Sequence, residues 1–192
     1  MSTWKKAAGL VIAGLFMLVM GLCKTALAGT TDTVLVTVTV NVVSVSVDTT
    51  TWAIGQVAPS AVAISNAIPV ENDGNVQEDY SLSLDHTGWE IATSSGAAGD
   101  KFVLSALFTT TPAASIVDNM FGETDGPDDV IVDGNTPASP TMYARTGEGP
   151  DAKGYDVVET LFRDLYLNFR APTSSVLTTE QSITVTVTAA AG

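Results

Sequence analysis

Cysteine and histidine are almost absent from this chain of 192 residues, which has one of each, Cys23 and His86. They leave too few soft ligands for a zinc site and no basis for a cysteine–histidine nucleophile pair. His86 falls in a predicted turn and no serine lies in a nucleophile-elbow context, so a serine triad is also disfavoured. Nothing singles out two carboxylates whose pKa values would be pushed apart, as glycoside hydrolysis requires. We therefore expect no catalytic residues and no enzymatic activity.

Basic side chains are also scarce, with 8 Lys and Arg against 21 Asp and Glu, which gives a net charge of −13. A surface this negative repels phosphate backbones and anionic lipid headgroups. We therefore expect neither nucleic-acid binding nor peripheral membrane binding. The chain length fits one domain of ordinary size, so two domains are not expected.

The apolar stretch near the N-terminus is too short to cross a bilayer. It covers residues 7–22, about 16 residues, whereas a membrane-spanning helix needs roughly 20. Two lysines precede this stretch, and a small-x-small triplet at residues 26–28 closes the segment. This is the three-part layout of a secretory signal peptide. The sequence predicts cleavage after Ala28, removal of residues 1–28 and export of the remainder.

The remaining chain, residues 29–192, contains no cysteine, because Cys23 lies in the predicted signal. Lipoprotein signals normally have a small residue before the cysteine, whereas this chain has Leu22, so export without a lipid is favoured over lipidation. The mature chain then has no disulfide, although its compartment would permit one. We expect a secreted or cell-surface protein with no membrane span.

Valines alternate with mostly polar residues at the start of the predicted mature chain. This period of two predicts a strand with one buried face. At Val42-Val43 the alternation slips by one residue, which predicts a bulge or a crossing from one sheet to another. The predicted strand covers residues 34–47, and its first face carries Val34, Val36, Val38, Val40 and Val42.

Strand signals recur as far as the C-terminus, where Ile183, Val185 and Val187 alternate with threonines and predict a closing strand. Residues 156–169 also fit one face of a helix, so a short helix or turn before the last internal strand is an alternative. The predicted fold class is an all-β antiparallel sandwich of the immunoglobulin-like or jelly-roll type. Its internal strands are expected within residues 61–70, 80–85, 89–93, 101–109 and 165–170.

Residues 110–155 hold five of the eight prolines and show little periodicity, so we expect a long excursion within the single domain, either functional or partly disordered. Six acidic residues lie there within sixteen positions that lack Lys and Arg. Because calcium takes roughly six to eight oxygen ligands, this cluster is a candidate calcium site, with a solvated acidic loop as the alternative. The candidate ligands are Asp118, Glu123, Asp125, Asp128, Asp129 and Asp133.

Two tryptophans, Trp52 and Trp89, are candidate stacking platforms for a carbohydrate. Large aromatic residues near strand starts are more often part of a sandwich core. This alternative is favoured for Trp89, because Gly88 lets a strand begin tightly and Ile91 continues the same parity.

Residues 68–84 read IPVENDGNVQEDYSLSL and are followed by Gly88-Trp89. In this motif a strand ends in an Asn-rich and Gly-rich turn, and the next strand carries alternating aliphatic residues. The motif resembles immunoglobulin-like accessory and adhesion modules of bacterial secreted proteins, which implies their sandwich fold. The layout of a signal followed by a β-prone segment is also similar to that of camelysin-type donor-strand fibre subunits.

From these patterns we expect an exported, non-enzymatic structural or assembly protein of the cell surface. The leading hypothesis is a fibre subunit that self-associates when residues 34–47 add a strand to the sheet of a neighbouring copy. Two alternatives stay open at this point. The segment is an ordinary first strand of its own domain, or the protein is a secreted module that binds a carbohydrate or another ligand.

Overall fold

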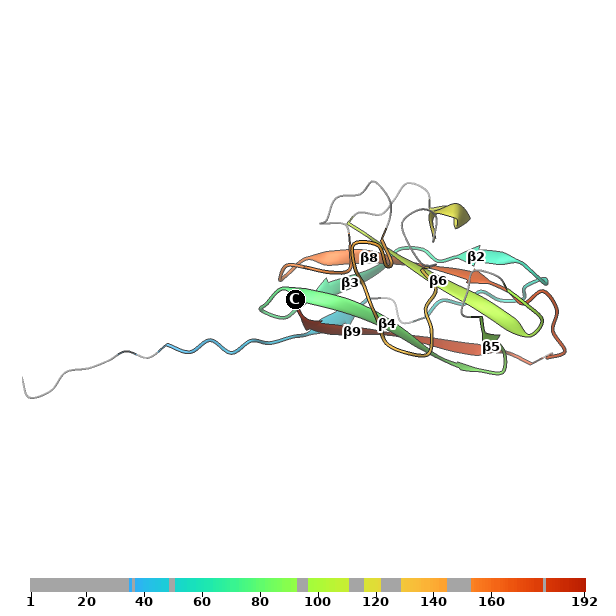
Figure 1. The fold of residues 1–192 in the computed structure, drawn as a ribbon, viewed down its shortest axis with the longest axis horizontal. Helices are drawn as coiled ribbons and strands as arrows, with labels where there is room; N and C mark the ends of the chain where they lie inside the picture. The colour runs from blue at the N-terminus through green and yellow to red at the C-terminus, as the bar shows by residue number, and fades with distance from the viewer. Residues whose placement is uncertain are drawn as a thin grey trace, which may run out of the picture. The chain divides into compact units, whose positions relative to one another are not determined.

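The computed structural model describes residues 35, 37–48, 51–92, 97–110, 116–121, 129–144, 153–177 and 179–192. The chain divides into two units, Met1–Thr39 and Val40–Gly192. The described residues of the first unit belong to no helix or strand. All the helices and strands of the described residues lie in the second unit, which is built from two β-sheets (Figure 1).

The larger sheet has six strands in the order β1-β3-β8-β6-β5, with β2 also paired to β8. Its strands pair antiparallel, except that β5 runs parallel to β6. The single parallel pair departs from the predicted antiparallel arrangement, because β5 is a two-residue pairing beside the start of β6 rather than a hairpin partner. The bounds are β1 Val45–Val47, β2 Val62–Ile64, β3 Ile68–Asn72, β5 Glu90–Ile91, β6 Lys101–Thr109 and β8 Phe162–Arg170.

The smaller sheet has three strands in the order β7-β4-β9. Strands β4 and β9 pair antiparallel over ten consecutive residues without a bulge. Beyond the strands, the described residues contain one short 3₁₀ helix, η1 (Asp118–Met120). The bounds of the strands are β4 Glu78–Thr87, β7 Thr136–Pro137 and β9 Ser182–Ala191.

The two sheets face each other across one main hydrophobic core, and Figure 1 shows β4 and β9 on one side and β8 with β6 on the other. This confirms the predicted all-β class with a sandwich-like architecture. Alternation along each strand turns one set of side chains inward. The core is formed mainly by Tyr80, Leu82 and Leu84 from β4, Phe102, Leu104 and Phe108 from β6, and Leu165, Leu167 and Phe169 from β8.

A break at Ser65 divides the predicted run of residues 61–70 into β2 and β3, which pair with different parts of β8. The hydroxyl of Ser65 accepts a hydrogen bond from the N–H of Leu167 at 2.9 Å, and the N–H of Ser65 donates to the carbonyl of Leu167 at 2.9 Å. A serine side chain thus replaces a ladder partner at the break. Because the backbone groups at the break keep hydrogen-bond partners, the run can leave the β2 register and pair again with β8 as β3.

The predicted turn after residue 72 is confirmed and is organised by the buried side chain of Asn72. Its amide group donates to the carbonyls of Val76 and Val157, both at 2.8 Å, and its oxygen accepts from the N–H of Gly74 at 3.0 Å. These bonds use three of the four bonding positions of the amide. Asn72 therefore joins the turn to the segment that precedes β8.

Residues 156–169 form no helix, so the helical form of that alternative is wrong, whereas its other form is present as a turn at residues 159–160. Strand β8 begins at Phe162, and left-handed backbone angles at Asp156 (φ 51°) and Thr160 (φ 63°) interrupt any helical path before it. The apolar residues at helical spacing are used in two ways. Leu165, Leu167 and Phe169 face the core as alternate strand residues, whereas Leu161 and Phe162 are exposed.

The predicted long strand at residues 34–47 is wrong in its extent, because among the described residues of this range only Val45–Val47 forms a strand. Val45 and Val47 pack against the core as the second parity predicts. The described valines of the first parity are exposed instead of buried. No bulge or sheet crossing forms at Val42-Val43, because residues 37–44 are not in a strand.

Candidate functional site

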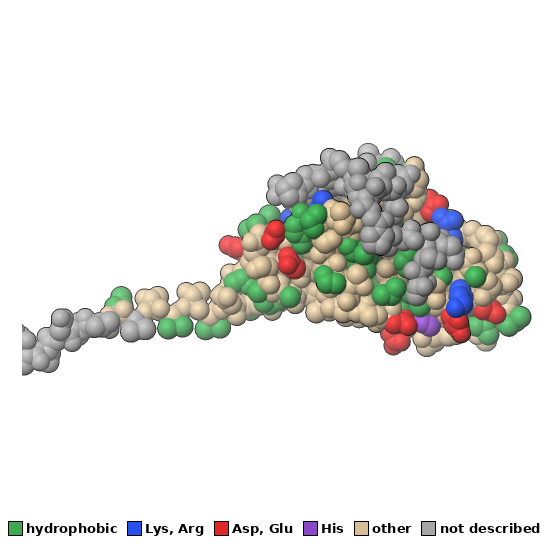
Figure 2. All heavy atoms as spheres, viewed as in Figure 1, with side chains coloured by type: hydrophobic (Ala, Val, Ile, Leu, Met, Phe, Trp, Pro, Cys, Tyr) green, Lys and Arg blue, Asp and Glu red, His purple; other side chains and the backbone are tan. Residues whose placement is uncertain are grey.

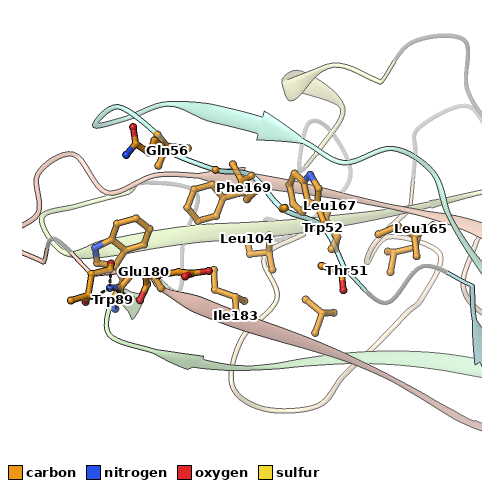
Figure 3. A pocket seen from close by; sticks show the side chains of 18 of the residues that line it. Thr51, Trp52, Gln56, Trp89, Leu104, Leu165, Leu167, Phe169, Glu180 and Ile183 are labelled. Atoms are coloured by element: carbon orange, nitrogen blue, oxygen red, sulfur yellow. Dashed lines mark hydrogen bonds between the residues drawn. The ribbon is translucent and has the colours of Figure 1, made fainter.

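A cavity of about 1000 Å³ lies between the two sheets, beside the inner face of β9 (Figure 3). Its floor is apolar and comes from β8, with Leu165, Leu167 and Phe169. In Figure 3, Trp89 and Glu180 lie at one end of the cavity, Ile183 lies near its middle, and Thr51 and Leu165 lie toward the other end. A space of this size is within the range of binding sites in proteins.

The β9 wall of the cavity is less buried than the strand beside it. In the ladder, Leu82 faces Val187 and Leu84 faces Val185. The two leucines of β4 are buried, whereas the two valines of β9 are only half-buried and line the cavity. The difference follows from position, because β4 has strands on both sides and β9 is the last strand of its sheet.

Within the described part of the chain, β9 pairs with β4 alone, so the backbone groups along its second edge pair with no strand. Natural sheets protect such edges with short strands, prolines, bulges or charged side chains. The other edge strands of this protein fit that rule, since β1, β2, β5 and β7 are two or three residues long and β7 contains Pro137. Strand β9 has ten residues, no bulge, no proline and no charge. It is therefore an open edge that is ready to pair with another strand.

The opposite wall of the cavity is formed by residues 51–57, which belong to no strand. Trp52, Ile54 and Val57 from this segment pack against the core as half-buried side chains. The residues between them, Ala53 and Gly55, are exposed. This wall meets the cavity with side chains, so the cavity is a slot between β9 and residues 51–57 with half-buried apolar side chains on both walls.

Both sequence-predicted tryptophans line this cavity, from segments 37 positions apart in the chain. The ring of Trp89 stacks on Phe169, with centroids 6.2 Å apart and an interplanar angle of 22°. The indole N–H of Trp89 donates to the hydroxyl of Ser175 at 2.8 Å. One face and the polar atom of Trp89 are thus already occupied, which agrees with the core role favoured for it over a sugar platform.

The predicted assembly valines that the structure describes are exposed, as is Leu35 of the opposite parity. Val38 is 78% exposed, Val40 is 70% exposed and Val42 is 49% exposed. Val34 and Val36 lie outside the described residues. The three valines share one parity, and no strand covers them among the described residues.

Hydrogen bonds from the turn hold the end of this valine row. The amide of Asn75 donates to the carbonyl of Val40 at 2.9 Å, and its oxygen accepts from the N–H of Val42 at 2.6 Å. A Cβ added at Gly74 would clash with the carbonyl oxygen of Val42, so glycine is required for this approach. The turn therefore fixes where the valine row ends and β1 begins.

The buried carboxylate of Glu78 continues this anchor, since it accepts a hydrogen bond from the N–H of Ser44 at 2.7 Å. Burial raises the pKa of Glu78, the Ser44 hydrogen bond opposes the shift, and the negative charge of Asp73 adds to it. Asp164 is also buried, on β8, and burial raises its pKa. Both groups therefore take up protons more readily in the folded protein than in the unfolded chain.

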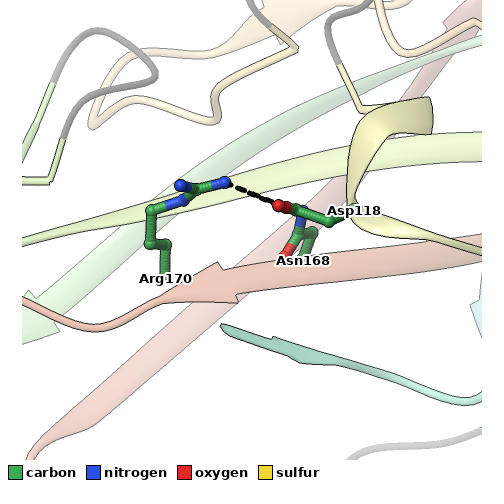
Figure 4. A network of polar contacts seen from close by, with 3 residues as sticks. All are labelled: Asp118, Asn168 and Arg170. Carbon is green, nitrogen blue, oxygen red and sulfur yellow. Dashed lines mark hydrogen bonds and ion pairs between the residues drawn. The ribbon is translucent and has the colours of Figure 1, made fainter. Parts of the chain in front are cut away.

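The predicted calcium ligands that are described do not come together. Asp118 accepts hydrogen bonds from Asn168 at 2.7 Å and from Arg170 at 2.8 Å (Figure 4). Asp129 is buried and accepts from the N–H of Tyr143 at 2.6 Å. The other three predicted ligands, Glu123, Asp125 and Asp128, lie outside the described residues.

The last described member of the acidic cluster, Asp133, lies 3.5 Å from Nε2 of His86. Figure 2 shows the single imidazole, in purple, beside acidic side chains in red. In the described ranges, no group of three or more Asp, Glu, His or Cys side chains is placed to hold a metal ion.

The open edge of β9 and the wall at residues 51–57 are the site features that sequence reasoning missed. The signal available for β9 was its Val and Thr alternation without any charge. That pattern predicts a strand with an apolar face, but it does not say whether one or two strands pair with it.

No protein-family model matches this chain, and no curated protein matches it. Among the helices of the described residues, none is long and apolar enough to span a membrane. The site is therefore interpreted from its own geometry.

Proposed function

We propose that this protein is an exported, non-enzymatic structural component of the cell surface whose copies join through the valine row at residues 34–42. The observation that carries the proposal is the exposure of Val38, Val40 and Val42 on one parity of an uncharged segment. Burying a valine side chain stabilises an association by about 1.5–3 kcal/mol. Three described valines therefore offer several kcal/mol toward assembly, before the cost of bringing two copies together.

The exposed row also weighs against the alternative of an ordinary first strand. Only Val45–Val47 pairs within the domain, as β1 on β3. The segment before it supplies the β-branched residues that favour strands, without a partner strand among the described residues. A strand supplied by another molecule would satisfy both its backbone and its apolar face.

Assembly is tested on the chain of residues 29–192 by light scattering and negative-stain microscopy over a range of concentrations, with calcium and with chelator. We expect high-order assemblies from this chain. The variant V38T/V40T/V42T keeps strand-forming side chains of similar size but removes the apolar face, and we expect it to stay monomeric. The control T37S/T39S changes the opposite parity and should still assemble. A parent chain that remains monomeric at high concentration in both conditions contradicts the proposal.

Export is tested separately by intact-mass measurement on protein from its native host. We expect an N-terminus at Gly29, because the signal layout places cleavage after Ala28. An N-terminus at Cys23 that carries acyl chains would contradict export without a lipid.

A carbohydrate- or ligand-binding module is the second candidate, and the placement of Trp52 and Trp89 on one cavity favours it. It predicts a monomer with saturable glycan binding that is lost in Trp52→Ala. This is the weaker candidate, because one ring face of Trp89 already stacks on Phe169 and is not free to stack on a sugar.

A further inference from the structure

The open edge of β9 and the cavity beside it form one continuous surface on the second unit. Ile183, Val185 and Val187 line the cavity from β9, and the backbone of the same strand forms the open edge. We propose that this surface is the acceptor for residues 34–43 of a second copy of the chain. The inference rests on the proposed function and adds the site at which the valine row binds.

The side-chain pattern of the two segments matches. A strand laid along β9 places one parity over the cavity and the other toward solvent. In residues 34–43 the first parity is entirely valine, and the second includes Thr37, Thr39 and Asn41. Strand β9 has the same division, with aliphatic residues inward and Ser or Thr at most outward positions. Valines would therefore meet valines in the cavity, and threonines would meet threonines on the outer face, which are favourable cross-strand pairs.

The lengths of the two segments also agree. Strand β9 offers ten residues of edge, and residues 34–43 are ten residues long. The chain after them is already used, because Ser44 bonds to Glu78 and Val45–Val47 pairs with β3. Within the segment itself, the hydrogen bonds of Val40 and Val42 to Asn75 hold the end of the donor to its own domain.

Charge favours a second copy as the occupant of this acceptor. A chain with a net charge of −13 repels its own copies, so contact is least costly where neither surface carries charge. Residues 33–47 contain no charged residue, and neither do residues 181–192. Glu180, at one end of the cavity, is its only charged lining residue. Both partners of the proposed contact are therefore free of the repulsion that the rest of the chain produces.

Cysteine cross-linking between copies tests the acceptor directly, because residues 29–192 contain no native cysteine. A T39C protein is co-assembled with T184C, T186C or T188C protein, which samples both strand directions and several registers. The matched control is T141C, at an exposed residue outside β9 and the cavity lining. We expect the mixed disulfide with at least one β9 variant to exceed the T141C control about tenfold, since paired residues react at high effective concentration. Equal yields from all four mixtures overturn the proposal.

A peptide experiment separates the acceptor from assembly as such. The non-assembling variant V38T/V40T/V42T retains Trp52 and Trp89 in the cavity wall as reporters. A synthetic peptide of residues 33–43 should change their fluorescence saturably, and a peptide with all five first-parity valines replaced by threonine should bind about tenfold more weakly or less.

The two experiments give distinguishable failures. If the parent chain assembles while the peptide leaves the tryptophan fluorescence unchanged and no β9 cross-link forms, the acceptor is wrong and the proposed function stands. If the parent chain does not assemble and the peptide does not bind, both are wrong.

Discussion

Two segments of this chain share a Val and Thr alternation but differ in what their valines contact. In β9, Val185 and Val187 face the core and pair across the ladder with buried leucines of β4. In the segment before β1, Val38 and Val40 are mostly exposed and belong to no strand. The same pattern therefore gives a strand where a partner edge is present and an uncovered apolar row where it is absent.

This difference shows that a period of two describes a strand's faces and not its neighbours. The alternation sets which side chains can share a face, whereas ladder hydrogen bonds require a second backbone. Both segments lack strand partners in the described structure. Strand β9 has one paired edge, and the valine row has no paired edge. The predictions below test this contrast, from the largest expected effect to the smallest.

The largest contrast is expected from placing one charge in each segment. Val187→Asp puts a carboxylate on the inner face of β9, and we expect a loss of about 3 kcal/mol in the free energy of unfolding, because a charge is poorly solvated between the sheets. Val40→Asp should change that free energy by no more than about 0.5 kcal/mol, because this side chain is exposed. Urea unfolding of both variants under non-assembling conditions measures the difference. Equal losses would contradict the distinction between the two segments.

The turn that anchors the valine row should also be essential to the fold. We expect Asn72→Ala to lower the free energy of unfolding by about 2 kcal/mol, because it removes one of the two donors to the carbonyl of Val157 and leaves the N–H of Gly74 without its acceptor. Chemical denaturation provides the measurement. A loss below about 0.5 kcal/mol would mean that the turn does not depend on this side chain.

The buried carboxylates make stability depend on pH in a defined direction. Burial raises the pKa of Glu78 above 4.5 and the pKa of Asp164 above 3.8. Since the folded state then binds more protons, stability should rise as the pH falls from neutral through the raised values, and this contribution should level off below the ordinary values. The variant E78Q/D164N should reduce the rise by on the order of 1 kcal/mol. Melting curves from pH 7.5 to pH 4 check this, and an unchanged slope in the variant would contradict it.

The smallest effect is expected at Asn75, an exposed residue whose side chain bonds only to the end of the valine row. We expect Asn75→Ala to change the free energy of unfolding by about 0.5 kcal/mol, because the bonds are open to water. It should nevertheless speed hydrogen exchange at the N–H of Val42. Unchanged exchange at Val42 would show that this residue does not hold the row.

Much of the fold follows from the sequence because its strands have strong local signals. The run at residues 101–109 is β6 with the predicted bounds, and the turn at Asn72 joins β3 to β4 as predicted. The same local pattern misled the prediction at residues 34–44, where no described strand completes the ladder. Local residues determine a face, but the number of neighbouring strands is a tertiary property.

The candidate site was only partly accessible to sequence reasoning for the same reason. The tryptophans and the valine row could be named from their residue types. The cavity that both Trp52 and Trp89 line could not, because it depends on how the two sheets pack. The acidic cluster shows the limit of composition. Asp118 and Asp133 are close in the sequence, yet one bonds to Arg170 and the other lies beside His86.

Hydrogen exchange of β9 in assembled and dispersed protein tests the central claim most directly. If residues 34–43 of one copy pair with β9 of another, amides in both segments become protected together on assembly, because both gain ladder hydrogen bonds. The variant V38T/V40T/V42T should show no such protection at the same concentration. Assemblies of the parent chain in which β9 exchanges as fast as it does in this variant would contradict the account.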